Sequence, residues 1–165
     1  MEVAMRKVRR VLHTGGRNSL KSWWRVKNPV RVVFNFMVIY FCRRLPSLRV
    51  KSALYRLTGM KVGSNVSVGL DAVFDIFFPE LIEIRDNAIV GFGTTVLAHE
   101  FLREEVRVGR VIIGRDVVIG ANTTILPGVS VGDGSTVSAM SLVNRDIEKG
   151  VLAGGVPARK ISGEG

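Results

Sequence analysis

His99 is the residue of this chain best suited to proton transfer near neutral pH. The chain has two histidines, and the other, His13, lies in a strongly basic segment where we expect it to be solvated. An imidazole ordinarily titrates close to neutrality, so it can accept a proton from a substrate hydroxyl. A histidine can also simply fill a corner of a β-sheet wall. Because His99 adjoins a charged interruption of an otherwise regular pattern, we favour a catalytic role.

A six-residue repeat supplies the elements that position His99. From residue 113 onward, each unit opens with an aliphatic residue, usually followed by glycine. The opening residues are Ile113, Ile119, Ile125, Val131, Val137 and Val143. Helices and ordinary strands have periods of about 3.6 and 2, so neither explains this pattern. We predict a parallel β-helix in which each hexad forms one short strand and one corner, with its first residue in the core. Glycine or another small residue near the corner would permit a tight turn.

The repeat extends upstream to Val62 with two interruptions. Val62 and Val68 open regular hexads, and the register restarts at Ile84 after an insertion around 77–83. The second interruption, 99–111, is rich in charged residues. With three hexads per coil, residues 62–143 supply roughly four coils, more than the three or so units that a stacked array needs. Insertions in such an array are candidates for function.

Charge divides the chain into two parts. Residues 1–61 hold 15 of the 24 Lys and Arg residues against one acidic residue, a formal charge of +14. Residues 62–165 hold a formal −4. We therefore predict one repeat domain, 62–165, preceded by a basic and mostly helical arm, 1–61.

The arm contains an apolar stretch that is too short to cross a bilayer. Its unbroken apolar run is Phe36–Cys42, whereas a spanning helix needs about 20 such residues. On a helix, one broad apolar face would contain Val30, Val33, Phe34, Met37, Val38 and Phe41, with Lys27, Arg31 and Asn35 on another. We expect residues 20–45 to contact a membrane surface, with Trp23 and Trp24 at headgroup depth. The alternative is a helix whose apolar face caps the open end of the solenoid or contacts another subunit.

Other classes of protein fit the sequence less well. The aromatic residues of the arm are clustered rather than interleaved with basic residues, which argues against nucleic-acid binding. The apolar run ends in Arg43-Arg44 without a small-residue cleavage site, so we do not expect a signal peptide. Cys42 is the sole cysteine, which leaves neither a disulfide framework nor a cysteine metal site. These features suit a cytoplasmic protein held at the inner membrane face.

Residues 62–161 resemble the hexapeptide-repeat acyltransferases, and within them the maltose, galactoside and xenobiotic O-acetyltransferases. Three features carry the resemblance. They are Asp86-Asn87-Ala88 leading to His99 through two hexads, the block 113–143 with its Leu126-Pro127-Gly128-Val129, and the tail Ala153-Gly-Gly-Val-Pro-Ala-Arg159. The resemblance implies a left-handed β-helix and a homotrimer with active sites between subunits. It also implies acetyl-CoA as co-substrate, no metal, and a saccharide or lipid-linked saccharide as acceptor.

The same resemblance assigns roles to individual residues. His99 would be the general base that takes the proton of the acceptor hydroxyl. A backbone amide near Gly120 and Ala121 would stabilise the oxyanion of the thioester. The positions that match the family's CoA contacts are Ala121, Ala139, Asn144 and Arg145, and Arg159 and Lys160 match its phosphate-facing tail. The two tail residues can equally be an ordinary solvated charge cluster.

Asp75 corresponds to the family's polar acceptor-binding position. It would bind an acceptor hydroxyl or orient His99, with Glu100, Glu104 and Glu105 as alternative partners of the histidine. A γ-type carbonic anhydrase shares the fold but needs three histidine ligands for zinc, which a single histidine in the repeat domain does not supply. The remaining alternative is a non-catalytic β-helix that serves as a scaffold or assembly subunit at the membrane surface.

Overall fold

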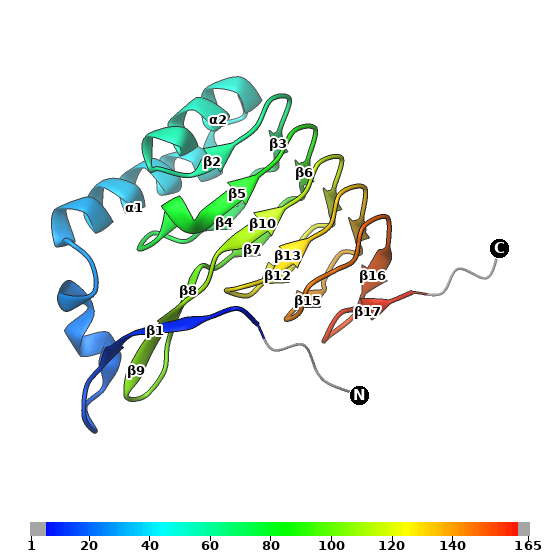
Figure 1. Cartoon of the computed structure of the whole chain (residues 1–165). Coiled ribbons are helices and arrows are strands. Elements are labelled where there is room, and N and C mark those ends of the chain that lie inside the picture. The colour runs from blue at the N-terminus through cyan, green and yellow to red at the C-terminus, as the bar shows by residue number, and fades with distance from the viewer. Residues whose placement is uncertain (1–5, 162–165) are drawn as a thin grey trace.

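The computed structural model describes residues 6–161 of the 165-residue chain. Its main body is a solenoid of three sheets whose strands stack coil on coil, starting beneath the N-terminal helices (Figure 1). The first sheet contains β2 (Lys61–Val62), β5 (Ile82–Ile84), β10 (Val111–Ile113) and β13 (Ser130–Val131). The second contains β3 (Ser67–Val68), β6 (Ile89–Val90), β11 (Val118–Ile119), β14 (Thr136–Val137), β16 (Leu152–Gly154) and β17 (Arg159–Lys160). The third contains β4 (Val73–Phe74), β7 (Thr95–Val96), β12 (Thr124–Ile125) and β15 (Leu142–Val143).

The register of the parallel strands follows the hexads. Ile113 pairs with Val131, 18 positions later, so one coil is three hexads. Ile84 pairs with Ile113, 29 positions later, because this coil carries the longer insertion. That insertion forms a hairpin of β8 (His99–Phe101) and β9 (Glu105–Val108), and the shorter one contains the 3₁₀ helix η2 (Pro79–Leu81). The prediction of one short parallel strand per hexad is confirmed.

The opening residues of the hexads form the core. Their exposed fraction is 8% at Val62 and at most 1% from Val68 to Val143. The residue before each opening position points outward and is half-buried or exposed. The predicted inward position of the first hexad residue is therefore confirmed.

The glycines that follow the opening residues do not act as turn residues. A Cβ on Gly120 would lie 2.3 Å from the amide nitrogen of Ala139 in the next coil, so the glycine permits close stacking of two corners. The left-handed backbone conformation occurs two residues later, at Asn122 with φ of 56° and at Asp116 with φ of 55°. Short polar side chains tolerate this conformation, which is why Asn and Asp recur there.

Two helices cover the first coil (Figure 1), and their polar side chains satisfy its open edge. These helices are α1 (Pro29–Arg44) and α2 (Leu48–Leu57). The fully buried Lys51 donates to the carbonyls of Val68 and Gly69 at 2.9 and 3.2 Å. Arg56 donates to the carbonyl of Val62 at 2.9 Å. Because no earlier coil pairs with these carbonyls, the helices supply the missing donors.

The arm is not entirely helical. Residues 9–13 form β1 (Arg9–His13), which pairs antiparallel with β9, and Ser19–Arg25 form the 3₁₀ helix η1. The segment Arg9-Arg-Val-Leu-His13 is extended because β9 offers it an open edge. The arm therefore contacts the inserted hairpin as well as the end of the solenoid. Residues 1–5 of the predicted arm lie outside the described part of the chain.

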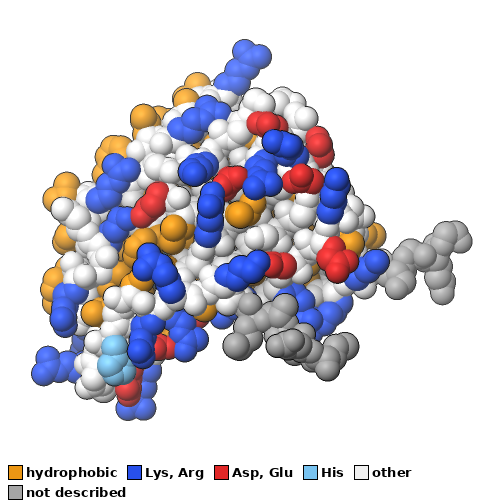
Figure 2. Space-filling view, viewed as in Figure 1, with side chains coloured by type: hydrophobic (Ala, Val, Ile, Leu, Met, Phe, Trp, Pro, Cys, Tyr) orange, Lys and Arg blue, Asp and Glu red, His pale blue; other side chains and the backbone are white. Residues whose placement is uncertain are grey.

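The apolar face predicted for α1 points away from the solenoid. Val30, Met37 and Phe41 are 77%, 60% and 59% exposed, and hydrophobic side chains gather along α1 at the left edge of Figure 2. The helix packs on the first coil through a different set, Val32, Asn35, Ile39 and Cys42. Asn35 is buried, and its Nδ2 donates to the carbonyl of Ile76 at 2.9 Å. Within residues 6–161, none of the helices has the length and apolar character that crossing a bilayer requires.

Candidate active site

Asp75 and His99 meet where the two insertions leave the third sheet. β4 and β7 pair so that Phe74 lies beside Val96. The segments that follow these two strands leave the sheet at the same corner. The Oδ2 atom of Asp75 lies 2.5 Å from the Nδ1 atom of His99. The sheet register therefore brings together two residues that are 24 positions apart in the sequence.

The carboxylate of Asp75 is buried and accepts five hydrogen bonds. Its Oδ1 accepts from the backbone amides of Phe77 and Phe78 at 2.8 and 2.9 Å. Its Oδ2 accepts from the amides of Ala98 and His99 at 2.7 and 2.9 Å, as well as from the imidazole. Burial alone would raise the pKa of Asp75, but the bonds from His99 and the backbone amides hold this pKa below its usual value. Asp75 is therefore ionised and fixed in place.

The ring of His99 packs against two aromatic side chains that also contact each other. Its centroid lies 4.8 Å from that of Phe77 and 5.0 Å from that of Phe101, and the side chain is 14% exposed. Since Nδ1 faces the carboxylate of Asp75, the neutral ring carries its proton on Nδ1. Its Nε2 then has a free lone pair and can accept a proton from a ligand.

The other carboxylates considered as partners of His99 have partners elsewhere. Glu100 pairs with Arg6 at 2.8 Å, from the arm. Glu105 pairs with Arg107 and, at 3.4 Å, with Arg10. Glu104 lies 3.9 Å from the Nε atom of its neighbour Arg103. Asp75 is thus the carboxylate that faces the imidazole.

A mainly apolar cavity of about 290 Å³ lies against this pair. It is bounded by α1, β4, the start of the first insertion and the chain leaving β7. The lining residues are Phe36, Ile39, Tyr40, Arg43, Val73, Phe74, Asp75, Ile76, Phe77, Leu97 and His99. The aromatic residues here are site residues that the sequence pattern did not indicate. Phe77 and Phe101 lie in insertions, where no repeat marks which side chains face inward, although both are close in sequence to Asp75 or His99.

A second group of predicted site residues lies at a different corner. Gly120 and Ala121 form the corner between the second and third sheets, and Ala139 stacks on them from the next coil. The amide of Gly120 donates to the carbonyl of Val137 at 2.7 Å and is therefore engaged in the fold. Within the described residues, the amide of Ala121 donates to no other group of the chain. Of these two amides, the structure leaves that of Ala121 available to a ligand.

The predicted basic residues gather at the last coil. Arg145, Arg159 and Lys160 line a cavity of about 240 Å³, together with the acidic Asp146 and Glu148. The Nε atom of Arg145 and the Oδ1 atom of Asn144 are buried without a hydrogen-bond partner among the described residues. Unsatisfied polar atoms of this kind suit a polar ligand. Asn144 precedes Arg145 but does not line the cavity.

The structure does not join these residues to the pair of Asp75 and His99 within one chain. Gly120 and Ala121 lie at the opposite edge of the third sheet from the corner that holds the pair. Among the cavities described for residues 6–161, none is lined both by His99 and by a predicted CoA residue. The two clusters are therefore separate on a single chain.

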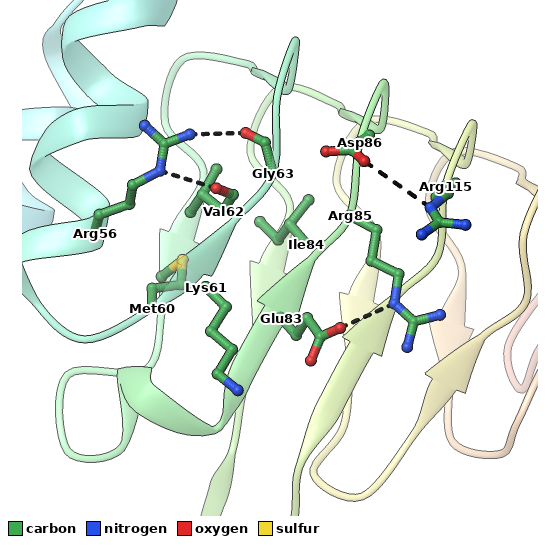
Figure 3. Close-up of a pocket in the computed structure, with 10 residues that line it drawn as sticks. All are labelled: Arg56, Met60, Lys61, Val62, Gly63, Glu83, Ile84, Arg85, Asp86 and Arg115. Atoms are coloured by element: carbon green, nitrogen blue, oxygen red, sulfur yellow. Dashed lines mark hydrogen bonds and ion pairs between the residues drawn. The ribbon is translucent and has the colours of Figure 1, made fainter.

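A larger hollow on the first sheet has a different character. Figure 3 shows its charged side chains, apart from Lys61, paired with one another or with the backbone. Arg85 pairs with Glu83 at 2.9 Å, and the guanidinium of Arg56 donates to the carbonyls of Val62 and Gly63. It holds no histidine, cysteine or serine that could act as a base or nucleophile. Residues 6–161 also contain no group of three side chains arranged to hold a metal ion.

Comparison with known proteins gives consistent matches. A family model described as "Hexapeptide repeat of succinyl-transferase" matches residues 110–142. The protein named "Putative acetyltransferase YvoF" from Bacillus subtilis (strain 168) is 48% identical over 147 residues, covering 88% of this chain and 86% of that protein. The galactoside O-acetyltransferase of Escherichia coli (strain K12) is 34% identical over 110 residues, which are 60% of this chain and 54% of that protein.

Solved structures share the fold. The hexapeptide-repeat acetyltransferase VCA0836 of Vibrio cholerae, complexed with acetyl-coenzyme A, aligns with a TM-score of 0.69 at 22% identity, over 81% of this chain and 86% of that one. A galactoside acetyltransferase in complex with coenzyme A aligns with a TM-score of 0.62 at 25% identity, over 81% and 80% of the two chains. The architecture of this chain is therefore that of the hexapeptide-repeat acetyltransferases.

Proposed function

The chain belongs to the hexapeptide-repeat acetyltransferases, and on this premise we propose that it transfers acetyl from acetyl-CoA to a hydroxyl of a saccharide or glycoconjugate. The observation that carries the proposal is the pair of Asp75 and His99 beside a cavity. The left-handed winding of the solenoid is assigned from the family resemblance.

In this proposal His99 is the general base. A hydroxyl at neutral pH is a poor nucleophile until a positioned base accepts its proton. The Nε2 atom of His99 takes that proton as the hydroxyl oxygen attacks the acetyl carbonyl, and later returns it to the leaving thiolate. Bound acetyl-CoA supplies the activated acetyl group as a thioester. Asp75 keeps the imidazole in the tautomer that leaves Nε2 free and stabilises the imidazolium that forms.

The proposed CoA residues fit an extended anionic ligand. Arg145, Arg159 and Lys160 offer cations for the phosphates, and the unpartnered Nε of Arg145 is a donor that a phosphate oxygen can satisfy. The amide of Ala121 is available to stabilise the oxyanion of the reacting thioester. Gly120 and Ala139 provide a corner without bulky side chains, along which the cofactor can lie.

We propose that the enzyme is a homotrimer. Since His99 and Ala121 lie at opposite edges of one sheet, one chain alone does not present base and cofactor residues to the same ligand. Apposition of two chains would bring the corner with His99 of one next to the corner with Ala121 of the other. A closed three-fold arrangement makes three such sites from one interface.

The arm suggests a further partner. Residues 20–45 combine the exposed apolar face of α1 with Arg44, whose side chain is 80% exposed. We propose a peripheral contact with an anionic membrane, on which a lipid-linked acceptor would be presented.

The proposal is tested first with acetyl-CoA alone, because this needs no acceptor. Calorimetry should find saturable binding near one site per chain, weakened by Arg145→Ala or Arg159→Ala. Release of CoA thiol with a panel of hydroxyl acceptors should then fall about 10²–10⁴-fold in His99→Ala, with acetyl-CoA affinity unchanged. The absence of acetyl-CoA binding at millimolar concentration would overturn the proposal and favour the non-catalytic scaffold.

A further inference from the structure

The cavity beside His99 is walled on one side by a helix that lies outside the repeat domain. Phe36, Ile39 and Tyr40 of α1 face Val73 and the other residues of the third sheet across it. Its volume of about 290 Å³ is at the lower end of the range for small-molecule pockets. The histidine of the catalytic pair lies in its wall, so a ligand in this cavity can contact the imidazole.

The cavity offers few polar groups to a ligand. Both oxygens of Asp75 are occupied by five N–H donors, and one of those donors is Nδ1 of His99. The remaining polar side chains in the lining are those of His99, Tyr40 and Arg43. A sugar ring buried here would leave most of its hydroxyls unpaired, which is unfavourable. The lining instead suits hydrocarbon with a hydroxyl at one end.

The cavity is continuous with the exposed apolar face of α1. The rings of Phe36 and Tyr40 are stacked with centroids 5.7 Å apart, and both residues line the cavity. They are also 46% and 58% exposed, beside the equally exposed Val33 and Met37. Hydrocarbon that enters at Phe36 and Tyr40 can therefore extend along α1 without crossing a polar surface.

We infer that this cavity binds the hydrocarbon portion of an amphipathic acceptor, whose hydroxyl then lies at Nε2 of His99. The inference rests on the proposed function and narrows its substrate class. The acceptor is an alkyl or prenyl glycoside or a similar lipid-linked hydroxyl compound, and a free sugar is a poor substitute. The saccharide portion remains outside the cavity, with the reacting hydroxyl at His99.

The two histidines make a direct test feasible. Selective ¹⁵N labelling of histidine gives signals from His13 and His99 alone, and His13→Gln assigns them. The full chain is titrated, without acetyl-CoA, with octyl β-glucoside below its micellar concentration and with methyl β-glucoside. Each buried methylene strengthens binding about fourfold, so octyl glucoside should shift the His99 signals with a Kd at least about tenfold lower. The His13 signals should not move.

Two variants of α1 separate the cavity from the helix surface. Phe36→Ala should reduce the preference for the octyl compound several-fold, because Phe36 lines the cavity. Met37→Ala removes a neighbouring exposed apolar residue that does not line it and should keep the preference. The inference is overturned if octyl glucoside leaves His99 unshifted, if both glucosides bind equally, or if both variants have the same effect. Failure of acetyl-CoA binding instead contradicts the proposed function, because that measurement is independent of the glucosides.

Discussion

At the scale of single residues, the proposed mechanism has Asp75 act through His99 rather than on the substrate. Five N–H groups fix its carboxylate, and none of these bonds needs to break for Nε2 of His99 to accept a proton. Phe77 and Phe101 pack against the ring and against each other. In the proposed mechanism Asp75 is thus a positioning residue, which would contribute the correct tautomer and a stabilised imidazolium.

Replacement of Asp75 tests this role. An amide has one acceptor oxygen. Asp75→Asn therefore leaves without an acceptor either the backbone amides of Phe77 and Phe78 or the N–H groups that now bind Oδ2, including Nδ1 of His99. We expect kcat to fall about 10²-fold or more, with little change in the KM for acetyl-CoA. The ¹⁵N signals of His99 should also show a changed tautomer. Glu100→Gln is the matched control, because Glu100 pairs with Arg6, and equal losses in both variants would contradict the assignment.

The lowered pKa of Asp75 also predicts how stability depends on pH. In the unfolded chain Asp75 has the usual pKa of an aspartate, about 4, whereas in the folded chain its pKa is lower. As the pH falls, the unfolded chain therefore binds this proton before the folded chain does. The contribution of Asp75 to the free energy of unfolding is complete above the unfolded pKa and is lost as pH falls through the folded pKa. Urea unfolding from about pH 6 to about pH 3 should show a smaller acid loss in Asp75→Asn than in the native chain. Parallel losses would show that another carboxylate dominates.

The two residues of the pair were predictable from sequence to different degrees. His99 follows from the chemistry of imidazole and the break in the repeat. Asp75 follows only from a family resemblance that left two roles open, and the pairing of β4 with β7 was needed to place it against His99. Phe77 and Phe101 carry no repeat signal, since the insertions that contain them depart from the hexad pattern.

At the scale of elements, the arm holds the hairpin that carries His99. β1 pairs along β9, and the amides of Thr14 and Ser19 donate to the carbonyls of Glu104 and Arg103 at 2.8 and 3.0 Å. β9 in turn pairs with β8, whose first residue is His99. Without β1 the hairpin would be a two-stranded ribbon, which is marginally stable by itself.

Removal of the first strand should affect catalysis more than folding. Deletion of residues 1–17 leaves the three solenoid sheets and the two helices in place but removes β1 from the hairpin. We expect kcat to fall about 10- to 100-fold because His99 is less well positioned, while acetyl-CoA affinity is kept. Arg10→Ala is the control, since it loses a side-chain pair at 3.4 Å but keeps the backbone pairing. Undiminished kcat in the shortened chain would show that the hairpin holds His99 unaided.

The hexads predicted the solenoid strands because every coil repeats the same inward position. The partner of β1 was not predictable, since the segment Arg9–His13 has no repeat and its edge-to-edge pairing depends on an insertion about 100 residues away. The orientation of α1 was predicted in part. Its apolar face is exposed, as contact with a membrane surface requires, but Asn35, expected on a polar face, is buried and donates to a carbonyl of the first coil.

At the scale of the whole molecule, an unusually apolar surface lies beside the proposed active site. The exposed residues of α1 lie next to the cavity that contains His99, and basic residues flank the helix. A monomeric protein rarely exposes such a continuous apolar patch without a partner. A membrane and a second subunit are the two partners that this surface can contact, and they predict different measurements.

Vesicle flotation distinguishes them through surface variants. Deletion of residues 1–45 would remove Ile39 and Cys42 from the core, so substitutions at Met37 and Phe41 are the cleaner change. We expect the native chain to float with vesicles that contain phosphatidylglycerol, less with pure phosphatidylcholine, and less again as salt screens the basic residues. The double variant Met37→Ser and Phe41→Ser should lose flotation, while Ile89→Ser, which removes an exposed apolar residue on β6, should keep it.

Light scattering on the same samples tests the alternative, a contact with a second subunit. A subunit contact through α1 requires that the double variant lower the molecular mass and that no form float, whereas a membrane contact leaves the mass of all forms unchanged.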